Sequence, residues 1–450
     1  TLSSSSAASD VYKRQGVVWK NYDRESVLYD LENDSTLTLN ETSTRILKEV
    51  LVYKNEYQKV AMNLLIENQE CEYDDLYGDV MECCNTLFAT PYFTTDPENA
   101  AFISLVGLVT SLETASIEIT KNCNLKCKHC YQGSHMDEQL MMNLNEVRSI
   151  ASKLGELGTL SVVLTGGEPF LHPNLVEIVE TFNNWNIRVV IFTNGQVIQN
   201  ETIRKLSNMN VLVRISLEGH NEEINDFIRG VGTFKKAIEF SNICRENNLS
   251  IGYSFTINSI NEKYFSDMLQ LAEDSFADEI EMSEILNVNQ NLNISSLMLS
   301  EKQSKNFRIN TLKGFSISKA FRKGMGLYRY KKGTEYICSA GTKNIFIDIN
   351  GDVYPCNLFA NHNEYFAGNV FSEDLLEIWR KSKVFIELRN LKKEDIEECA
   401  NCPASENCKG GCRARAVFES GSLRGKMEKG FCKVTNMMVE EMNHNAFVHN

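Results

Sequence analysis

The sequence lacks any apolar segment long enough to cross a membrane. Its longest such run, Phe102 to Thr110, falls well short of the roughly 18 residues that a membrane helix needs. No basic segment followed by an apolar stretch marks a secretory signal. We therefore expect a cytoplasmic protein without a membrane partner.

Positive charge and proline are both scarce. The 46 Lys and Arg stand against 60 Asp and Glu, which gives a net charge of −14. Such a chain repels phosphate, so we expect no nucleic-acid partner. With 6 Pro in 450 residues, 42% hydrophobic and 24% charged residues, the composition is that of a globular protein and excludes wholesale disorder and fibrous rods. The length suggests two or three domains.

Cysteine, by contrast, is abundant, and its distribution is informative. Of the 14 Cys, we interpret four scattered ones, Cys71, Cys83, Cys84 and Cys244, as buried apolar residues. The other ten fall into two groups, at 123–130 and 338–432. Because disulfides are rare in the cytosol, grouped Cys indicate metal or redox sites.

The N-terminal part reads as a small domain over residues 16–95. Residues 1–15 lack Met and are rich in Ser and Ala, so we expect them to be foreign or disordered. Strand patterns follow at 17–19, 27–29 and 36–39, then three short helix patterns, the first capped by Asn40 or Thr42. This order predicts a winged-helix-like domain.

Residues 114–300 alternate strand and helix patterns, which predicts an α/β fold. Six such units indicate a parallel sheet or partial (β/α)6 TIM-like barrel. In such folds the reactive residues lie at the carboxyl ends of the strands. The predicted strands are 116–120, 160–165, 189–193, 212–217, 251–256 and 279–282.

The C-terminal part is rich in Cys. We expect a linker over 301–334 and a separate domain over 335–450, with a hairpin that turns at Asn350-Gly351.

Cys123, Cys127 and Cys130 form a CxxxCxxC set just after the first predicted strand of the barrel. Three thiolates on one tight loop can hold three irons of a [4Fe–4S] cluster and leave the fourth iron open. The alternative is zinc, for which His129 or His135 could supply a fourth ligand. The place at a strand end favours a catalytic site.

The stretch from Cys123 to Tyr131, CNLKCKHCY, resembles the signature of radical S-adenosylmethionine (SAM) enzymes. Three further motifs of that family follow in order at strand ends. The resemblance implies that GGEP meets the SAM amino group, that SLEG together with Arg229 helps to bind the SAM carboxylate, and that Tyr131 lies near the adenine. Glu218 stands where the family usually has Asp. The motif residues are Gly166, Gly167, Glu168 and Pro169, then Thr193, Asn194 and Gly195, then Ser216, Leu217, Glu218 and Gly219.

The C-terminal Cys pattern resembles the SPASM domain, which carries two auxiliary [4Fe–4S] clusters. The resemblance assigns Cys338, Cys356 and Cys412 to the first cluster. It assigns four more to the second, namely Cys399, Cys402, Cys408 and Cys432. By spacing alone, a pair of structural zinc sites remains an alternative.

One ligand of the first auxiliary cluster is missing. Fully ligated relatives supply a further Cys shortly before the equivalent of Cys338, but residues 331–337 contain none. The vacant iron could bind a substrate thiolate. A carboxylate or water as the fourth ligand is the alternative.

The N-terminal block resembles the peptide-recognition element of ribosomal-peptide maturases, in which a leader peptide adds as a strand to a sheet edge. DNA binding is disfavoured, because residues 16–90 carry 6 Lys and Arg against 15 Asp and Glu. A dimerisation or packing role is the remaining alternative.

Together these resemblances imply a radical SAM peptide maturase with SAM and three [4Fe–4S] clusters. It would bind a ribosomal precursor peptide through its leader, take electrons from a flavodoxin or ferredoxin, and form a thioether cross-link. The alternatives are a formylglycine maturase of the sulfatase type, carbon–carbon cross-linking, and a non-catalytic iron–sulfur electron carrier. Asn357 stands where the formylglycine maturases have an Asp that acts as a base.

Overall fold

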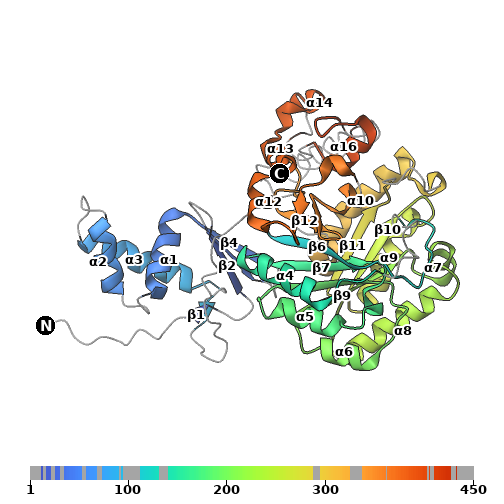
Figure 1. Cartoon of the computed structure of the whole chain (residues 1–450), viewed down its shortest axis with the longest axis horizontal. Coiled ribbons are helices and arrows are strands. Elements are labelled where there is room, and N and C mark those ends of the chain that lie inside the picture. The colour runs from blue at the N-terminus through green and yellow to red at the C-terminus, as the bar shows by residue number, and fades with distance from the viewer. Residues whose placement is uncertain are drawn as a thin grey trace. The chain divides into compact units, whose positions relative to one another are not determined.

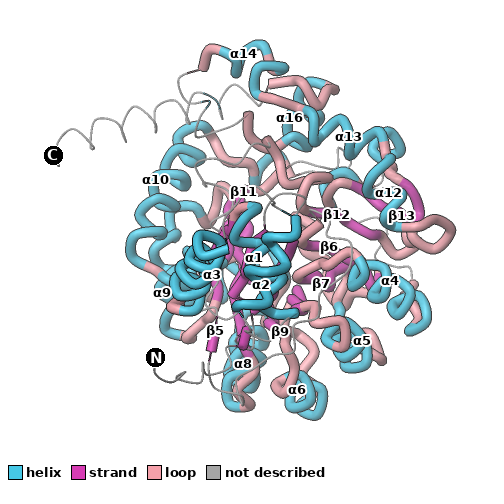
Figure 2. Tube along the Cα trace, turned by 90° about the vertical axis from the view of Figure 1, so that its left-hand side faces the viewer, coloured by secondary structure: helices cyan, strands magenta, loops and turns pink. Residues whose placement is uncertain are grey.

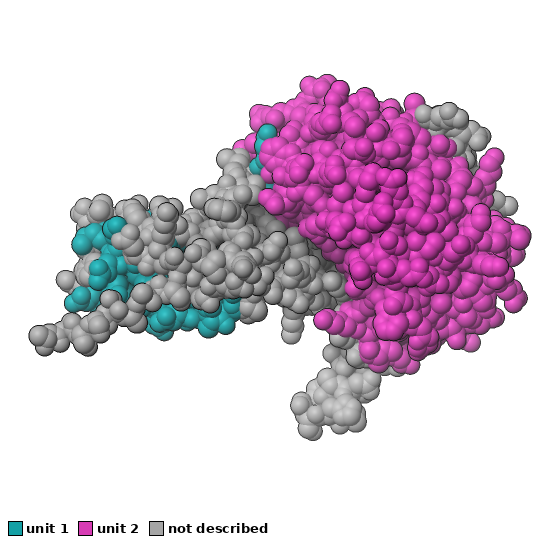
Figure 3. Space-filling view, turned by 90° about the horizontal axis from the view of Figure 1, so that it is seen from below, with its two compact units in different colours: residues 1–111, 156–158 teal, residues 112–155, 159–450 magenta. Residues whose placement is uncertain are grey.

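The six strands expected for residues 114–300 all form, and they make one parallel sheet in the computed structural model (Figure 1). The structure describes residues 12–13, 17–21, 26–30, 35–52, 57–67, 73–90, 93–94, 112–130, 140–286, 294–324, 337–360, 362–402, 405, 410–426 and 432. The chain divides into two units, residues 1–111 with 156–158, and residues 112–155 with 159–450 (Figure 3). Each unit is described by itself.

The first unit contains a three-stranded antiparallel sheet in the order β2-β3-β4, followed by three helices. The expected strands and helices are confirmed, and Asn40 caps the first helix by accepting from the amide of Ser43 at 2.8 Å. The elements are β2 (Val17–Asn21), β3 (Ser26–Asp30), β4 (Ser35–Leu39), α1 (Glu41–Val52), α2 (Tyr57–Glu67) and α3 (Tyr73–Phe88).

Two apolar clusters hold this unit together. Leu28, Leu39 and Leu47 pack with Leu87 and Phe93 between the sheet and the helices. A second cluster of Val, Ile, Leu and Ala side chains joins the three helices to one another. The segment 1–15, which we expected outside the fold, contributes the short strand β1 (Tyr12–Lys13), which pairs with β5 (Phe93–Thr94).

The second unit is built on the parallel sheet β6 to β11, whose strands lie side by side in chain order. Each of these strands contributes buried residues to the core, and the helices surround the strands as in a half-open barrel (Figure 2). The strands are β6 (Thr114–Thr120), β7 (Ser161–Gly166), β8 (Arg188–Thr193), β9 (Val211–Leu217), β10 (Ser250–Ile257) and β11 (Glu279–Glu284).

The covering helices match the periodicity of the sequence, with one addition. The short α7 was not predicted. It starts at Asn221, whose side chain accepts from the amide of Ile224 at 3.1 Å. The helices are α4 (Leu144–Glu156), α5 (Leu175–Asn183), α6 (Asn200–Leu206), α7 (Glu222–Arg229), α8 (Thr233–Glu246) and α9 (Phe265–Asp274).

The expected hairpin of the Cys-rich part forms, but it is not separate from the barrel sheet. Strand β12 (Asn344–Ile347) pairs in parallel with β6, and β13 (Asp352–Tyr354) and β14 (Gly368–Asn369) extend the sheet to nine strands. Gly351 supplies the turn with a φ of 82°. The first predicted Cys of this region therefore lies just before a strand that hydrogen-bonds to the strand carrying the CxxxCxxC loop.

The segment 301–334, expected as a linker, contains two helices, α10 (Glu301–Ile317) and α11 (Lys319–Gly324). Ser300 and Gln303 form a capping box at the start of α10. Helix α11 lies against β11, and a Cβ at Gly324 would approach the carbonyl oxygen of Ile280 to 2.4 Å. The connection is thus packed onto the last barrel strand.

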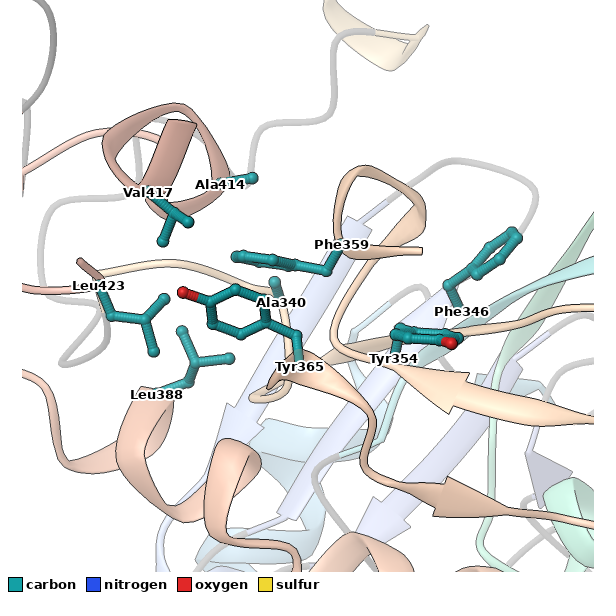
Figure 4. Packing of buried hydrophobic residues seen from close by; sticks show 9 residues of the cluster. All are labelled: Ala340, Phe346, Tyr354, Phe359, Tyr365, Leu388, Ala414, Val417 and Leu423. Carbon is teal, nitrogen blue, oxygen red and sulfur yellow. The ribbon is translucent and has the colours of Figure 1, made fainter. Parts of the chain in front are cut away.

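The C-terminal helices enclose an apolar cluster (Figure 4). Phe359 and Tyr365 lie with ring centroids 4.5 Å apart, and Leu388, Ala414 and Val417 close around them. The helices are α12 (Leu375–Lys381), α13 (Lys383–Asn390), α14 (Glu397–Ala400) and α16 (Arg413–Ser420). Single 3-10 turns are η2 (Pro169–Leu171), η3 (Glu262–Tyr264), η4 (Ser295–Leu297), η6 (Asn357–Phe359), η7 (Asn363–Tyr365) and η8 (Lys393–Asp395).

The barrel strands carry a buried charge network away from their carboxyl ends. Arg188 pairs with Glu279 at 2.9 Å, and Arg214 pairs with both Glu279 and Glu281. Burial raises the pKa of Glu279, but the two guanidinium groups outweigh that effect and hold its pKa below the usual range. The network joins β8, β9 and β11 and leaves the carboxyl ends for the site. Within the described part of the chain, no helix has the length and apolarity that a membrane crossing requires.

Candidate active site

The CxxxCxxC loop lies where expected, at the carboxyl end of β6. The thiols of Cys123, Cys127 and Cys130 are half-buried. The pKa of Cys127 is raised to about 11, because burial, with Glu218, Cys130 and Cys123 nearby, outweighs the lowering effect of Arg229. The three thiols are therefore close neighbours, and one cationic side chain lies among them.

Two glycines let the next strand end approach this loop closely. The amide of Gly167 donates to the carbonyl oxygen of Thr120, and the amide of Glu168 donates to that of Asn122, each at 2.7 Å. A Cβ at Gly166 would lie 2.0 Å from the oxygen of Thr120, and one at Gly167 would lie 2.1 Å from the oxygen of Asn122. The GG of GGEP is thus required by backbone contact with the Cys loop, and Pro169 begins the buried turn η2.

The carboxylate of Glu168 is fully buried and binds the neighbouring strand end. It accepts from the hydroxyl of Thr193 at 2.7 Å, from the amide of Asn194 at 2.7 Å and from the amide of Phe170 at 3.0 Å. Burial raises the pKa of Glu168, and these three bonds oppose that rise. Glu168 therefore joins GGEP to the Thr193-Asn194-Gly195 motif, in addition to the role that the sequence predicts for it toward SAM.

Asn194 extends this connection back to the Cys loop. Its side-chain amide donates to the Asn124 side chain at 2.8 Å and lies 3.9 Å from the sulfur of Cys123. Gly195 adopts a φ of 69°. Three strand ends, those of β6, β7 and β8, are thus held together by backbone and amide hydrogen bonds.

At the end of β9, Glu218 is buried and lies against the side chains of His129 and Arg229. One oxygen, Oε1, lies 2.7 Å from Nε2 of His129 and accepts from Nη2 of Arg229 at 2.7 Å. Burial raises the pKa of Glu218, but His129 and Arg229 together hold it below the usual value. The second oxygen, Oε2, is buried and has no hydrogen-bond partner in the described part of the chain.

The remaining motif residues are placed as follows. Ser216 lies half-buried on β9, and a Cβ at Gly219 would come within 2.6 Å of Ile224. Tyr131 and His135 lie outside the described residues. His129, considered above as a zinc ligand, faces Glu218 instead. No three His, Cys, Asp or Glu side chains converge on a single-ion site among the residues that the structure describes.

Three of the C-terminal thiols gather beside the apolar cluster of Figure 4. Cys338, Cys356 and Cys412 all pack against it. Burial raises the pKa of Cys338 and of Cys356, and Cys412 raises both further. These are the three residues that the resemblance assigns to the first auxiliary cluster.

A second group of thiols forms separately. Burial raises the pKa of Cys399, and the neighbouring Cys432 and Cys402 raise it further. Cys402 has the same effect on Cys432. Cys408, the fourth residue of this predicted set, lies outside the described residues.

These residues fit the groups that the sequence implies. Thiols on one loop are suitable soft ligands for iron, and the unpartnered Oε2 of Glu218 leaves an acceptor open for a ligand hydroxyl or ammonium group. Gly166 and Gly167 let the ends of β6 and β7 approach each other closely beside the loop.

Sequence reasoning missed the polar residues that hold these motifs in place. Asn124 binds Asn194, and Asn225 on the unpredicted helix α7 accepts from the amide of Glu218 at 2.9 Å. Asn261 donates to the carbonyl oxygen of Glu218 at 2.9 Å. Isolated Asn residues give no pattern in a sequence, so only the spacing of Asn124 next to Cys123 could have drawn attention to one of them.

Glu168→Gln is expected to weaken SAM binding about tenfold while leaving iron content unchanged. An amide retains the size of the carboxylate but loses the charge, and a charge-assisted hydrogen bond accounts for roughly 1.4 kcal/mol or more. The new side-chain NH2 group would also face a backbone N–H that donates to the carboxylate in the parent. Because two donors cannot bond to each other, we also expect a lower melting temperature.

Titration of SAM onto reconstituted enzyme measures this effect. The exposed Glu177→Gln on α5 is the matched control and should bind SAM like the parent. A Glu168→Gln variant with parental SAM affinity would remove the predicted role of this carboxylate.

Comparison with known proteins agrees with this geometry. Residues 117–272 match the radical SAM superfamily model, and residues 338–403 match the model of the SPASM iron–sulfur cluster-binding domain. The first match contains the Cys loop and the three strand-end motifs.

Several characterised proteins resemble the chain over about two thirds of its length. The mycofactocin maturase MftC of Mycolicibacterium smegmatis is 27% identical over 68% of this chain and 80% of its own. The subtilosin biosynthesis protein AlbA of Bacillus subtilis is 27% identical over 67% of each chain. An AdoMet-dependent heme synthase of Oleidesulfovibrio alaskensis is 26% identical over 68% of this chain and 83% of its own.

A solved structure resembles nearly the whole fold. Streptococcus suis SuiB bound to its precursor peptide SuiA matches with a TM-score of 0.72 at 16% identity, over 93% of this chain and 99% of SuiB. The chain therefore contains a radical SAM domain that is followed by a SPASM iron–sulfur cluster-binding domain.

Proposed function

We propose that this enzyme modifies a ribosomally made precursor peptide and installs a thioether between a Cys sulfur and a carbon of that peptide. The observation that supports a peptide substrate is that the structural likeness to SuiB extends over 93% of this chain. It reaches beyond the two thirds that the sequence relatives share. SuiB is known in complex with a precursor peptide, and MftC is a maturase.

The first unit offers an edge for a leader peptide. Within its described strands, β2 and β4 each pair on one side, with β3. An extended peptide can add to such an edge by main-chain hydrogen bonds. The acidic composition of residues 16–90 would favour a basic leader.

The chain's own residues would hold and orient the reacting groups. Cys123, Cys127 and Cys130 would bind the first [4Fe–4S] cluster, and Arg229, held by Glu218, would meet the SAM carboxylate. When bound, SAM and this cluster supply a 5′-deoxyadenosyl radical through one-electron cleavage. Glu168 and Asn194 fix the strand ends around that point, and placing one C–H bond there is the task of the fold.

The C-terminal Cys would hold two auxiliary [4Fe–4S] clusters, so that the enzyme would carry three clusters in all. Cys338, Cys356 and Cys412 would bind the first auxiliary cluster, and the second would be bound by Cys399, Cys402, Cys408 and Cys432. The seven auxiliary Cys, where full ligation of two clusters would need eight, favour thioether formation. Asn357, which begins η6 beside Cys356, stands in place of the Asp expected of a formylglycine maturase and disfavours that alternative.

Mass analysis of the peptide after anaerobic turnover tests the proposal. A thioether removes two hydrogens from the precursor, and the linked Cys resists alkylation. An unmodified precursor, despite reductive cleavage of SAM, would reject the peptide substrate. Heme precursors would then be the next substrates to assay, given the heme synthase relatives.

Deleting residues 1–95 should spare SAM cleavage but lower kcat/KM for the precursor by at least about tenfold, because the edge for the leader is lost. A minimal core peptide without leader should be processed equally by both forms. The SAM-cleavage rate of the truncated enzyme checks that its barrel is intact. If the truncated enzyme processes the full precursor at the parental kcat/KM, the first unit does not recognise the leader.

A further inference from the structure

The end of α7 and the turn that follows it display exposed apolar side chains. Val231 is 100% exposed and Phe227 is 51% exposed. Gly230 and Gly232 flank Val231 with φ angles of 111° and 81°, which other residues rarely adopt. Two glycines thus shape a turn whose central side chain, that of Val231, lies entirely in solvent.

This turn is held in one conformation. The carboxylate of Asp226 accepts from the amide of Gly232 at 2.6 Å, from the amide of Phe234 at 2.8 Å and from the hydroxyl of Thr233 at 3.0 Å. A fixed turn that presents an apolar side chain to water is typical of a contact surface.

The turn is joined to the loop of the radical SAM motif. The amide of Lys128 donates to the carbonyl oxygen of Ile228 at 2.9 Å. The side-chain ammonium group of Lys128 lies 3.3 Å from the centre of the Phe227 ring. Lys128 directly follows Cys127 in the sequence. This surface therefore begins one residue away from a thiol that we assign to the first cluster.

The charge of this surface differs from that of the whole protein. Lys126 and Lys128 are exposed on the Cys loop, and Lys235 and Lys236 are exposed in the first turn of α8. The positive end of a helix disfavours cations, and that first turn contains no acidic residue. The two lysines thus occupy a position that helix stability disfavours, which points to a role outside the helix. The exposed acidic residues of these helices are Glu222 and Glu223, at the opposite end of α7, and Glu239 and Glu246, farther along α8.

We propose that this surface docks a small acidic one-electron carrier protein that reduces the first cluster. We define it as the docking face: Lys126, Lys128, Phe227, Val231, Lys235 and Lys236. The proposal rests on the assignment of Cys123, Cys127 and Cys130 to that cluster. One electron leaves the carrier and the cluster passes from the 2+ to the 1+ state, while no bond forms or breaks and no proton moves.

The chemistry of electron transfer selects this partner. Transient redox complexes use small interfaces, and opposite charges steer their association. A few lysines around two exposed apolar side chains match that kind of interface, and the protein's overall charge of −14 would repel an acidic carrier elsewhere.

Stopped-flow reduction of the reconstituted enzyme by a reduced, acidic ferredoxin tests the proposal. The variant Val231→Asp with Lys235→Glu and Lys236→Glu should lower the second-order rate constant by at least about tenfold at low salt. It should also flatten the salt dependence of that constant, and weaken ferredoxin binding measured by calorimetry without turnover. Reduction by dithionite should be unchanged, because a small molecule needs no docking face.

The matched control is Ile317→Asp with Lys319→Glu, which alters an exposed apolar residue and a neighbouring lysine on other helices. It should behave as the parent. Parental ferredoxin kinetics and binding in the triple variant would overturn the proposal, and so would weakened precursor binding with parental ferredoxin kinetics. If dithionite yields no reduced cluster even in the parent, the cluster assignment fails instead.

Discussion

Replacing Cys123, Cys127 and Cys130 together with Ala is expected to reduce 5′-deoxyadenosine formation to background and lower the iron content from about twelve to about eight per chain. The three thiols share one loop after β6 and influence one another's pKa. Removing them leaves the first cluster without its protein ligands, whereas the two C-terminal thiol groups can still bind their clusters.

We expect a complete loss of SAM cleavage because the three thiol groups have different roles. The first thiol group is linked to the strand-end motifs through the side chain of Asn194, which contacts Cys123 and Asn124. In the C-terminal part, Cys338, Cys356 and Cys412 pack beside the apolar cluster of Figure 4. Loss of the first group should therefore abolish SAM cleavage without disturbing the other two.

Iron analysis and quantification of 5′-deoxyadenosine after anaerobic reconstitution measure both effects. Cys83→Ala, a half-buried thiol on α3 outside both Cys groups, is the control and should match the parent in both assays. Reductive SAM cleavage by the triple variant would show that the site is elsewhere.

The periodic part of the fold could be predicted from the sequence because burial imposes a regular pattern on it. Every strand from β6 to β11 carries buried residues, and a motif stands at the carboxyl end of each strand from β6 to β9. The Gly-Gly of GGEP was predicted as a motif, and its cause, the contact of Gly166 with Thr120, lies in the tertiary structure.

The features that escaped prediction depend on contacts between distant residues. Strand β12 pairs with β6 although more than 200 residues separate them in the sequence, so the Cys-rich part extends the barrel sheet. Helix α7 is short and mostly polar, and its hydrophobic pattern is too brief to detect. Likewise, the pairing of His129 with Glu218 cannot be deduced from spacing, because the two residues belong to different strand ends.

The Glu in SLEG illustrates how a departure from a motif is accommodated. Glu has one more methylene than the Asp that the family uses, and here its Oε1 reaches both His129 and Arg229. The cationic Arg229 is thereby fixed beside Cys127, whose pKa it lowers. The longer side chain still leaves Oε2 open toward a ligand.

A precursor Cys is expected to bind the first auxiliary cluster directly. The sequence provides Cys338, Cys356 and Cys412 for it, and no Cys precedes Cys338 in residues 331–337. Those three thiols are mutual neighbours in the structure. A thiolate is a strong, soft ligand for the remaining iron, and coordination would keep it deprotonated and oriented toward a carbon radical.

Adding the Cys-containing precursor should therefore change the electron paramagnetic resonance spectrum of this cluster. A precursor with that Cys changed to Ser or Ala should leave the spectrum unchanged, and should support 5′-deoxyadenosine formation without any thioether. The triple variant of Cys123, Cys127 and Cys130 removes the overlapping signal of the first cluster and isolates the response. If the Cys-free precursor is cross-linked as efficiently as the parent peptide, the thioether proposal fails and carbon–carbon bond formation becomes the better account.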